Sequence, residues 1–369
     1  MFKKKKRCLF DGMYPMNYLA FKPIYECLMH DARLDIRFMN SYDNLNFCKE
    51  VDIARKKFID ERWVRVFSWD LYFATDFLCP KLGEETKKIF LSHGISEKKY
   101  GSEEPSFLKG QLSSFDRVFV SSKAQYTRLR SLLKREEAAK VQYVGYPRLA
   151  YLTTNNYDVT CIRKELGLDN NLPIIVFAPT WGEEGSWKKF GKEIVETLVS
   201  LNVNVLLKLH DGSYYARSFD KKHRFKKHLN EFEKYCTVRI IRESDIYPYL
   251  ILSDMLISDY GSLILEYQVL KKPTIFFDLD KHNELVVSNP IKLELLRKTC
   301  ICIKSPQELG SALSRAKNTF NTHNAYRDEL IKEYIDNAGT AQKQIIETIY
   351  KLLNLGNMED TLFNQEKLG

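Results

Sequence analysis

The chain has 369 residues, of which 44% are hydrophobic and 28% are charged, a normal globular composition with room for two domains. No apolar run approaches the ~20 residues that a membrane span needs, and the N-terminus lacks a signal-peptide apolar region, so we expect a cytosolic protein. The net charge is +9, but no zinc-finger, helix-turn-helix or aromatic RNA-binding motif accompanies it, and we expect no nucleic-acid partner.

Part of this charge is concentrated in one N-terminal segment, which consists of Lys3, Lys4, Lys5, Lys6 and Arg7. A basic cluster of this kind binds anionic lipid or a phosphate polymer. It therefore predicts contact with an anionic membrane surface or polymer, and a peripheral location on the inner face of the cell membrane. The alternative is a solvated terminus that only keeps the protein in solution.

The first half of the chain alternates strand-like and helix-like segments. Helices are expected over residues 16–31, apart from Pro23, and over residues 123–133. Strands are expected at residues 7–12, 34–41, 63–69, 87–94, 115–122 and 141–148. Strands that are separated by helices are typical of a parallel α/β sheet.

The pattern starts again in the second half. Strands are expected at residues 172–181, 203–210, 238–243, 254–259, 273–278 and 300–303, and a terminal helix at residues 338–354. The sequence thus predicts an α/β protein with two Rossmann-like domains facing a cleft. We expect an acceptor-side domain at residues 1–148, a nucleotide-donor domain with the terminal helix at residues 149–354, and a polar tail at residues 355–369.

The stretch SDYGSLILEYQVLKKPTIFF, residues 258–277, combines a carboxylate, a glycine and a hydroxyl between two apolar runs. It predicts a strand, a turn at Asp259 and Gly261, a helix from Ser262 and another strand. Such a turn presents backbone N–H groups and a helix N-terminus at the carboxyl edge of a parallel sheet, where anions bind. The alternatives are a phosphate seat and an ordinary helix that Ser262 caps.

Polar residues also follow other expected strands. His93 ends one in the first half, whereas Thr180, Lys208 and His210 lie at the ends of two in the second. Strand carboxyl ends share one edge of an open α/β sheet, so these groups are expected to converge on the cleft. A single strand-end histidine is more often structural, but one in each domain favours a function.

No motif indicates a metal or a cofactor. The eight cysteines are scattered, and no CxxC pair occurs among them. We therefore expect neither.

The motifs LSHG, VGYPR, FAPTW, KLH and ISDYGSLILEYQVLKKPTIFF are similar, in sequence and in order, to those of the CDP-glycerol glycerophosphotransferases that build teichoic acids and capsular polymers. The resemblance covers roughly residues 87–277. It implies a GT-B-type fold, a CDP-activated polyol donor and a glycan or polyol-phosphate acceptor, lipid-linked or not. The implied reaction transfers glycerol phosphate or another polyol phosphate to a hydroxyl and releases CMP.

The resemblance also implies roles for single residues. His93 matches the histidine of the His-Gly-Thr-Pro motif, a proposed catalytic base, and His210 matches a histidine that contacts donor phosphate. Gly261 and Ser262 match paired serines that hold the pyrophosphate. The chain departs from the family after Gly94, at Lys208 and Asp211 in place of Arg and Pro, and at Gly261 and Glu266 in place of Ser and Asp.

Glu266 lies four residues after Ser262, on the same side of the expected helix, where it reaches the donor ribose or is merely solvated. Lys208 and the amides near Gly261 are expected to face the departing nucleotide.

Two other functions stay open. One is a GT-B-type glycosyltransferase with a nucleotide-sugar donor, because a fold alone does not fix the reaction. The other is a non-catalytic module that binds anionic polymer, against which the two matched histidines argue.

Overall fold

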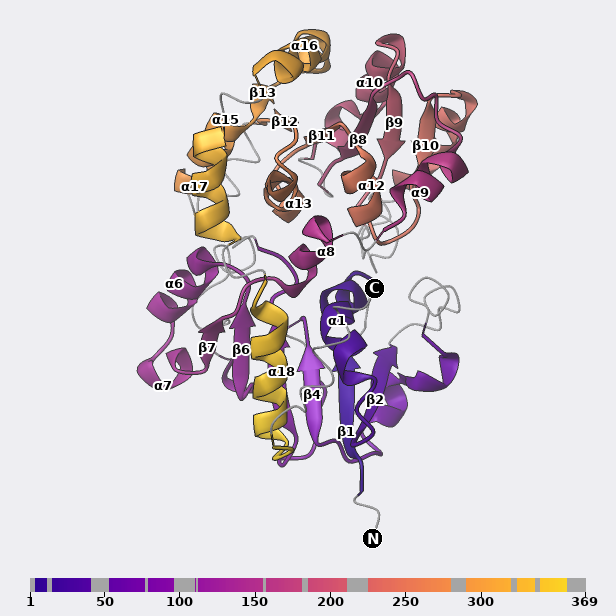
Figure 1. Ribbon diagram of the computed structural model, residues 1–369. Helices are drawn as coiled ribbons and strands as arrows, with labels where there is room; N and C mark the ends of the chain where they lie inside the picture. The colour runs from indigo at the N-terminus through magenta and orange to yellow at the C-terminus, as the bar shows by residue number, and fades with distance from the viewer. Residues whose placement is uncertain are drawn as a thin grey trace. The chain divides into compact units, whose positions relative to one another are not determined.

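The computed structural model describes residues 4–11, 15–40, 53–76, 79–95, 110, 112–154, 157–180, 185–210, 225–279, 290–319, 324–335 and 339–356. The chain forms two compact units (Figure 1). The first comprises Met1–Ile95, Glu103–Ala150 and Ile335–Gly369, and the second comprises Ser96–Ser102 and Tyr151–Tyr334. Within the ranges described, every helix is too short or too polar to cross a bilayer.

The first unit is built on a seven-stranded parallel sheet in the order β3-β2-β1-β4-β5-β6-β7. Its order reverses between β1 and β4, which makes it a doubly wound Rossmann-like sheet with a switch point between these two strands. The strands are β1 (Lys6–Asp11), β2 (Leu34–Asn40), β3 (Phe58–Asp60), β4 (Leu71–Ala74), β5 (Lys87–Leu91), β6 (Arg117–Val120) and β7 (Val141–Tyr143). Its helices include α1 (Pro15–Leu28), α3 (Glu61–Val64), α6 (Lys123–Leu132), α7 (Arg135–Ala138) and α18 (Ala341–Leu352), with 3-10 turns η1 (Arg55–Lys57) and η2 (Pro147–Leu149).

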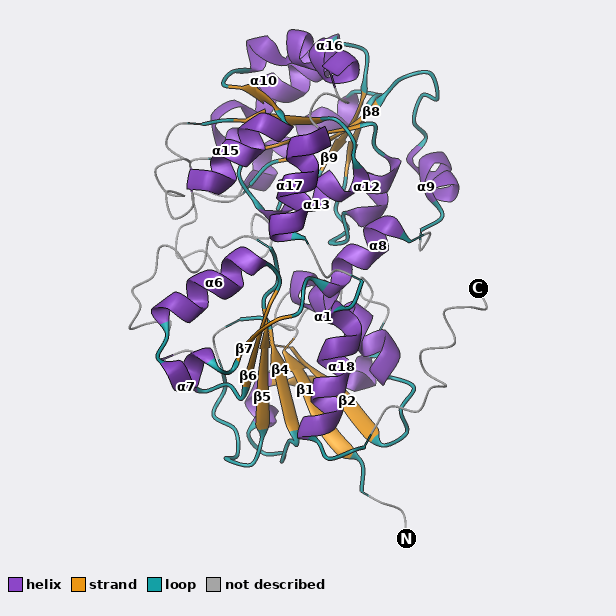
Figure 2. Ribbon diagram, turned by 60° about the vertical axis from the view of Figure 1, so that its left-hand side comes forward, coloured by secondary structure: helices purple, strands orange, loops and turns teal. Residues whose placement is uncertain are grey.

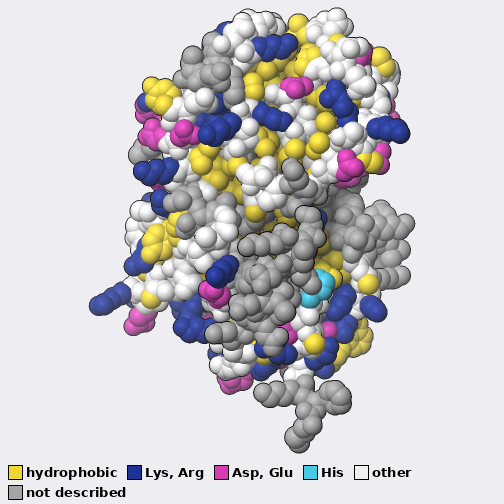
Figure 3. Space-filling view, viewed as in Figure 1, with side chains coloured by type: hydrophobic (Ala, Val, Ile, Leu, Met, Phe, Trp, Pro, Cys, Tyr) yellow, Lys and Arg dark blue, Asp and Glu magenta, His cyan; other side chains and the backbone are white. Residues whose placement is uncertain are grey.

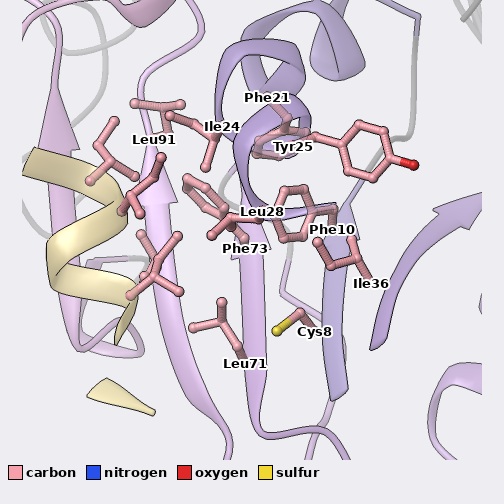
Figure 4. Packing of buried hydrophobic residues seen from close by; sticks show 14 of the residues in the cluster. Cys8, Phe10, Phe21, Ile24, Tyr25, Leu28, Ile36, Leu71, Phe73 and Leu91 are labelled. Atoms are coloured by element: carbon pink, nitrogen blue, oxygen red, sulfur yellow. The ribbon is translucent and has the colours of Figure 1, made fainter. Parts of the chain in front are cut away.

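Helix α1 covers the centre of this sheet with an apolar face (Figure 4). Phe21, Ile24 and Leu28 are fully buried and recur at helical spacing. The ring of Phe10 on β1 lies 5.2 Å from that of Phe21 and 5.2 Å from that of Phe73 on β4. These contacts join the two central strands and α1 into one core.

Helix α18 belongs to the first unit, although we expected the terminal helix in the second. Its buried stripe of Ile345, Ile346 and Ile349 completes the core under α1, and the two helices lie side by side in Figures 1 and 2. The Tyr350 hydroxyl donates to Asp31 Oδ2 at 2.7 Å. A stripe at helical spacing shows that a helix is buried, but the partner sheet is fixed by such long-range contacts, which the sequence order does not reveal.

The hydrogen bond from Tyr350 to Asp31 is expected to stabilise the fold in a pH-dependent way. Burial alone would raise the pKa of Asp31, but hydrogen bonds from Arg33 and Tyr350 lower it below its ordinary value. Because the folded pKa lies below the unfolded one, this stabilisation is present above pH ~4 and is lost as the pH falls through the folded pKa. We expect Tyr350→Phe to lower the free energy of unfolding by ~1 kcal/mol at neutral pH.

Urea unfolding at neutral and acidic pH tests this prediction. The difference between wild type and Tyr350→Phe should shrink once Asp31 is protonated, because the hydroxyl then loses a charged acceptor. Tyr326→Phe is the control, since Tyr326 is 43% exposed. An equal difference at both pH values would show that the bond to the ionised carboxylate contributes nothing.

Residues 63–69 do not form the strand that we expected. Asp60 accepts a hydrogen bond from the Arg62 backbone and caps α3, and the next strand, β4, begins only at Leu71. The Trp69 indole then donates to the Val64 carbonyl at 2.8 Å and fixes the turn. Trp63, Val66 and Phe67 are exposed in this segment, so its apolar content does not report burial in a sheet.

The second unit is built on a six-stranded parallel sheet in the order β10-β9-β8-β11-β12-β13. Counted from its own first strand, this is again the Rossmann order, with the reversal between β8 and β11. The strands are β8 (Ile174–Ala178), β9 (Asn204–Leu207), β10 (Val238–Ile240), β11 (Met255–Ser258), β12 (Thr274–Phe277) and β13 (Ile301–Ile303). The predicted fold class, α/β with two Rossmann-like domains, is confirmed.

Helices in Figure 2 flank both sheets. Those of the second unit include α8 (Ala150–Thr153), α9 (Val159–Leu166), α10 (Ser186–Ser200), α12 (Tyr247–Leu252), α13 (Ser262–Tyr267), α15 (Pro290–Thr299), α16 (Leu309–Thr319) and α17 (Asn324–Tyr334), with 3-10 segments η4 (Phe225–Lys234), η5 (Gln268–Leu270) and η6 (Pro306–Glu308). The chain passes between the units at Ala150, close to the expected boundary at residue 148.

Candidate active site

In the second unit, the predicted donor-binding residues follow three neighbouring strands. Thr180 follows β8, His210 follows β9, and Asp259 to Ser262 follow β11. These strands are adjacent and parallel, so their carboxyl ends lie at one edge. The β8 and β11 ends flank the switch point, which is where ligands bind in open α/β sheets.

Asp259 organises this edge from inside the protein. Its side chain is only 1% exposed, and Oδ1 accepts from the Thr180 backbone N–H at 2.6 Å. Oδ2 accepts from both the backbone N–H and the hydroxyl of Ser186, each at 2.7 Å. Because Ser186 begins α10, the carboxylate ties the end of β8 and the start of α10 to β11. Asp259 therefore fixes the positions of Thr180 and Ser186 relative to the end of β11.

The turn at Gly261 and Ser262 differs from an ordinary serine cap. Gly261 is the N-cap of α13 and Ser262 is the first helical residue, so Ser262 is not the cap that we considered. A Cβ atom on Gly261 would lie 3.1 Å from Thr180 Oγ1, which itself donates to the Tyr260 carbonyl at 2.9 Å. Since α13 spans only Ser262–Tyr267, the dipole of so short a helix contributes little at this turn.

The β9 end carries two basic side chains of different exposure. Lys208 is 5% exposed, and its ammonium donates to the Leu209 carbonyl at 3.0 Å. His210 is partly exposed. Asp211, which stands in place of the family's proline, lies outside the described residues.

Glu266 is buried rather than solvated. It is 5% exposed, and Oε2 accepts a hydrogen bond from the Tyr247 hydroxyl at 2.7 Å. Tyr247 is fully buried at the start of α12. The hydrogen bond joins α12 to α13, and the burial of Glu266 removes the solvated alternative.

His93 in the first unit is oriented by a backbone carbonyl. It follows β5, is partly exposed, and its Nδ1 lies 2.6 Å from the Thr75 carbonyl oxygen at the end of β4. A carbonyl only accepts, so the contact assigns the proton to Nδ1 and the basic lone pair to Nε2. The Asn17 side-chain amide also donates a hydrogen bond to the Thr75 hydroxyl.

The turn that carries His93 is held by a buried amide that we did not predict. Gln125 of α6 is fully buried and donates to the Gly94 carbonyl at 2.8 Å and to Ser92 Oγ at 3.1 Å. Its own oxygen accepts from the Ser121 backbone at 2.8 Å. No local sequence signal marks Gln125 or Thr75, because each acts across neighbouring strands.

The basic N-terminal segment is not simply a free tail. Lys6 and Arg7 form the start of β1, and Lys6 pairs with Asp70 at 2.9 Å. Lys4 and Lys5 are exposed, and Lys3 lies outside the described residues.

Within the same described ranges, no group of three or more His, Cys, Asp or Glu side chains is arranged to hold a metal ion.

Comparison with known proteins decides the family. The profile of the CDP-Glycerol:Poly(glycerophosphate) glycerophosphotransferase family matches residues 69–342, a range that includes His93, His210 and the turn after β11. The chain belongs to this family. The resemblance that we inferred from the motifs is thereby confirmed.

Curated relatives of this glycerophosphotransferase-family chain are considerably longer than the matched part. A teichoic acid glycerol-phosphate transferase of Staphylococcus aureus is 26% identical over 58% of this chain and 54% of its own length. A teichoic acid poly(glycerol phosphate) polymerase of Staphylococcus epidermidis is 27% identical over 39% of this chain and 20% of its own length. The chain therefore spans about half or less of these two relatives.

Solved structures share the fold of the family chain. A variant of the wall teichoic acid polymerase TagF has a TM-score of 0.69 at 18% identity, covering 95% of this chain and 89% of that one. A TagF variant soaked with CDPG has a TM-score of 0.68 at 17% identity, and the match covers 95% of this chain and 90% of that one. Staphylococcus aureus MnaA with UDP has a TM-score of 0.60 at 13% identity, and the match covers 95% of this chain and 97% of that one. These likenesses show the two-domain GT-B-type fold.

Proposed function

We propose that the chain transfers a glycerol-phosphate or other polyol-phosphate unit from a CDP-activated donor to a hydroxyl of a cell-wall or capsular polymer. The observation that carries this proposal is the family match, whose range contains both motif histidines and the turn after β11. The orientation of His93 and the three strand ends at the switch point support it. No cofactor is invoked. The acceptor is a glycan or a polyol phosphate, lipid-linked or not.

On the acceptor side, His93 acts as the general base. Its Nδ1–H is held by the Thr75 carbonyl, so Nε2 takes the proton of the acceptor hydroxyl. The acceptor oxygen then forms a bond to the phosphorus that carries the polyol. The bond from that phosphorus to the oxygen of the CMP phosphate breaks, and the electron pair leaves with CMP.

On the donor side, the second unit stabilises the charge that develops on the leaving phosphate. We assign this role to the Ser262 hydroxyl, the amides near Gly261, Lys208 and His210, because phosphoryl transfer depends mainly on positioned donors and charge. Thr180 and Asp259 keep the turn in place through their hydrogen bonds to each other and to the Tyr260 carbonyl.

We propose that Glu266 Oε1 accepts a hydrogen bond from a hydroxyl of the donor ribose. The hydrogen bond from Tyr247 to Oε2 fixes the side chain for this contact. This proposal requires a carboxylate held close to the turn, which its position one helical turn after Ser262 supplies.

Replacing Ser262 by Ala tests the donor seat. The hydroxyl donor is lost while the backbone amides stay, so the affinity for CDP should fall by ~1.5–3 kcal/mol. Calorimetric titration of CDP into wild type and Ser262→Ala measures this change, and thermal unfolding measures stability alongside. Ser253→Ala is the control, because the Ser253 hydroxyl is buried in the same unit and donates to the Leu250 carbonyl.

The control should lose stability without losing affinity for CDP. Ser262→Ala should do the opposite. A folded Ser262→Ala protein with unchanged CDP affinity would refute the assignment of this turn to the donor.

We further propose that the chain works at the inner face of the cell membrane, where nucleotide-activated donors are available. The exposed Lys4 and Lys5, with Arg7 at the start of β1, support attraction to anionic lipid. Each basic residue near such a surface contributes about 1 kcal/mol, which salt screens. Lys6 contributes less than we expected, because Asp70 already pairs with it.

A further inference from the structure

The segment after β3 exposes three large apolar side chains close together in sequence. Trp63 is 58% exposed, Val66 67% and Phe67 45%. All three lie within residues 63–69, which we expected to form a strand. Exposed apolar residues that occur singly are normal, but a cluster with aromatic members marks an interaction site.

The exposure of these side chains is built into the local structure. Asp60 caps α3, and its carboxylate also holds the Arg62 side chain at 2.8 Å. The Val66 backbone N–H donates to the Trp63 carbonyl at 3.0 Å, and the buried Trp69 indole donates to the Val64 carbonyl at 2.8 Å. These hydrogen bonds therefore hold the turn in a conformation that leaves Trp63, Val66 and Phe67 exposed to solvent.

Basic side chains from another part of the sequence lie beside this turn. The Arg7 guanidinium is 6.0 Å from the centre of the Phe67 ring, and the adjacent Lys6 pairs with Asp70 just after the turn. Arg65, Lys4 and Lys5 are exposed. Figure 3 shows hydrophobic side chains next to Lys and Arg side chains at the lower right, on the β2 side of the first unit.

We propose that Trp63, Val66 and Phe67, together with Lys4, Lys5, Arg7 and Arg65, form an apolar and basic surface that inserts shallowly into an anionic bilayer. Tryptophan and phenylalanine favour the headgroup boundary, and basic residues around them attract anionic lipid. A basic segment alone gives weak, salt-sensitive adsorption, so stable attachment needs a second signal. The apolar side chains supply that second signal.

The positive charge of the surface decides between a membrane and a second copy of this chain. Two copies that met through this surface would bring Lys4, Lys5, Arg7 and Arg65 of each close to the same residues of the other, and like charges repel. An anionic bilayer instead pairs with these charges and accepts the apolar side chains.

Vesicle co-sedimentation of the purified full chain tests the inference. The probes are phosphatidylcholine vesicles with and without phosphatidylglycerol, each at low salt and at ~0.5 M NaCl, where charges are screened within a few ångströms. The variants are Trp63→Ser/Phe67→Ser and Lys4→Gln/Lys5→Gln. Met29→Ser is the control, because Met29 is 50% exposed in the same unit but lies outside this surface.

Wild type should bind anionic vesicles at both salt concentrations, more weakly at high salt. The aromatic double variant should bind ~10-fold or more weakly at high salt, since it lacks the unscreened apolar contribution. The lysine double variant should lose binding mainly at low salt, and Met29→Ser should match wild type. The Trp63 emission, taken as the difference between wild type and Trp63→Phe, should shift to the blue on anionic vesicles.

Three results would overturn the inference: equal vesicle binding by wild type and the folded aromatic variant, an unchanged Trp63 emission, or self-association that the aromatic variant abolishes without any vesicle binding. The test needs no catalysis, so its failure leaves the proposed transferase activity standing. Conversely, an inactive protein that binds vesicles as expected would contradict only the proposed function.

Discussion

His93→Ala should lower turnover of a CDP-polyol donor by ~10²–10⁴-fold while the affinity for CDP is nearly unchanged. The acceptor hydroxyl loses its base, because Nε2 is the atom that the Thr75 contact leaves basic. The groups assigned to the nucleotide all belong to the second unit, whereas His93 belongs to the first. Initial rates of CMP release and calorimetric titration of CDP measure the two quantities separately.

His30→Ala provides the matched control for this variant. His30 is exposed just after α1, and its loss should change neither rate nor affinity. If His93→Ala kept the wild-type rate, or if its rate fell only in proportion to a loss of folded protein, His93 would be a structural residue.

Asp259→Ala should remove both stability and CDP binding. Three donors, the Thr180 N–H and the N–H and hydroxyl of Ser186, lose a buried acceptor in this variant. At ~1–3 kcal/mol for each unsatisfied buried donor, the free energy of unfolding should fall by ~3 kcal/mol or more. The turn before Ser262 should also lose its shape, so the affinity for CDP should fall at temperatures where the variant is still folded.

Asp254→Ala separates this effect from a general weakening of β11. The Asp254 carboxylate accepts from the Ile174 N–H at 2.7 Å at the opposite end of the same strand pair. Its loss should cost ~1 kcal/mol and leave CDP binding intact. Equal urea midpoints and equal CDP affinities for the two variants would refute the special role of Asp259.

Two of the strands that the sequence predicted correctly are buried on both faces. Residues 174–178 and 274–277 are short, continuous apolar runs of which every residue is buried, and both appear as β8 and β12. Residues 63–69 have a similar apolar content, but Trp63, Val66 and Phe67 are exposed and only Val64 and Trp69 are buried. Apolar composition does not distinguish a buried strand from a turn that exposes apolar side chains, so that prediction was wrong.

The site was predictable to the extent that it follows strand order. Strand carboxyl ends share an edge, which placed Thr180, His210 and the turn at Gly261 together before the sheet order was known. Thr75 and Gln125 could not be found in this way, because no strand is predicted at residues 71–74 and both residues act through contacts that are distant in sequence. The burial of Glu266 depends on Tyr247, which no spacing along the helix reveals.

The most direct test of the central claim is the identity of the nucleotide released from a panel of donors. The purified chain is incubated with CDP-glycerol, CDP-ribitol, UDP-sugars and GDP-sugars in the presence of a polyol-phosphate acceptor, and the products are separated by anion exchange. We expect CMP release with formation of a phosphodiester, in amounts that His93→Ala strongly reduces. Release of UDP or GDP with glycosyl transfer, and no CMP from either CDP-polyol, would contradict this expectation.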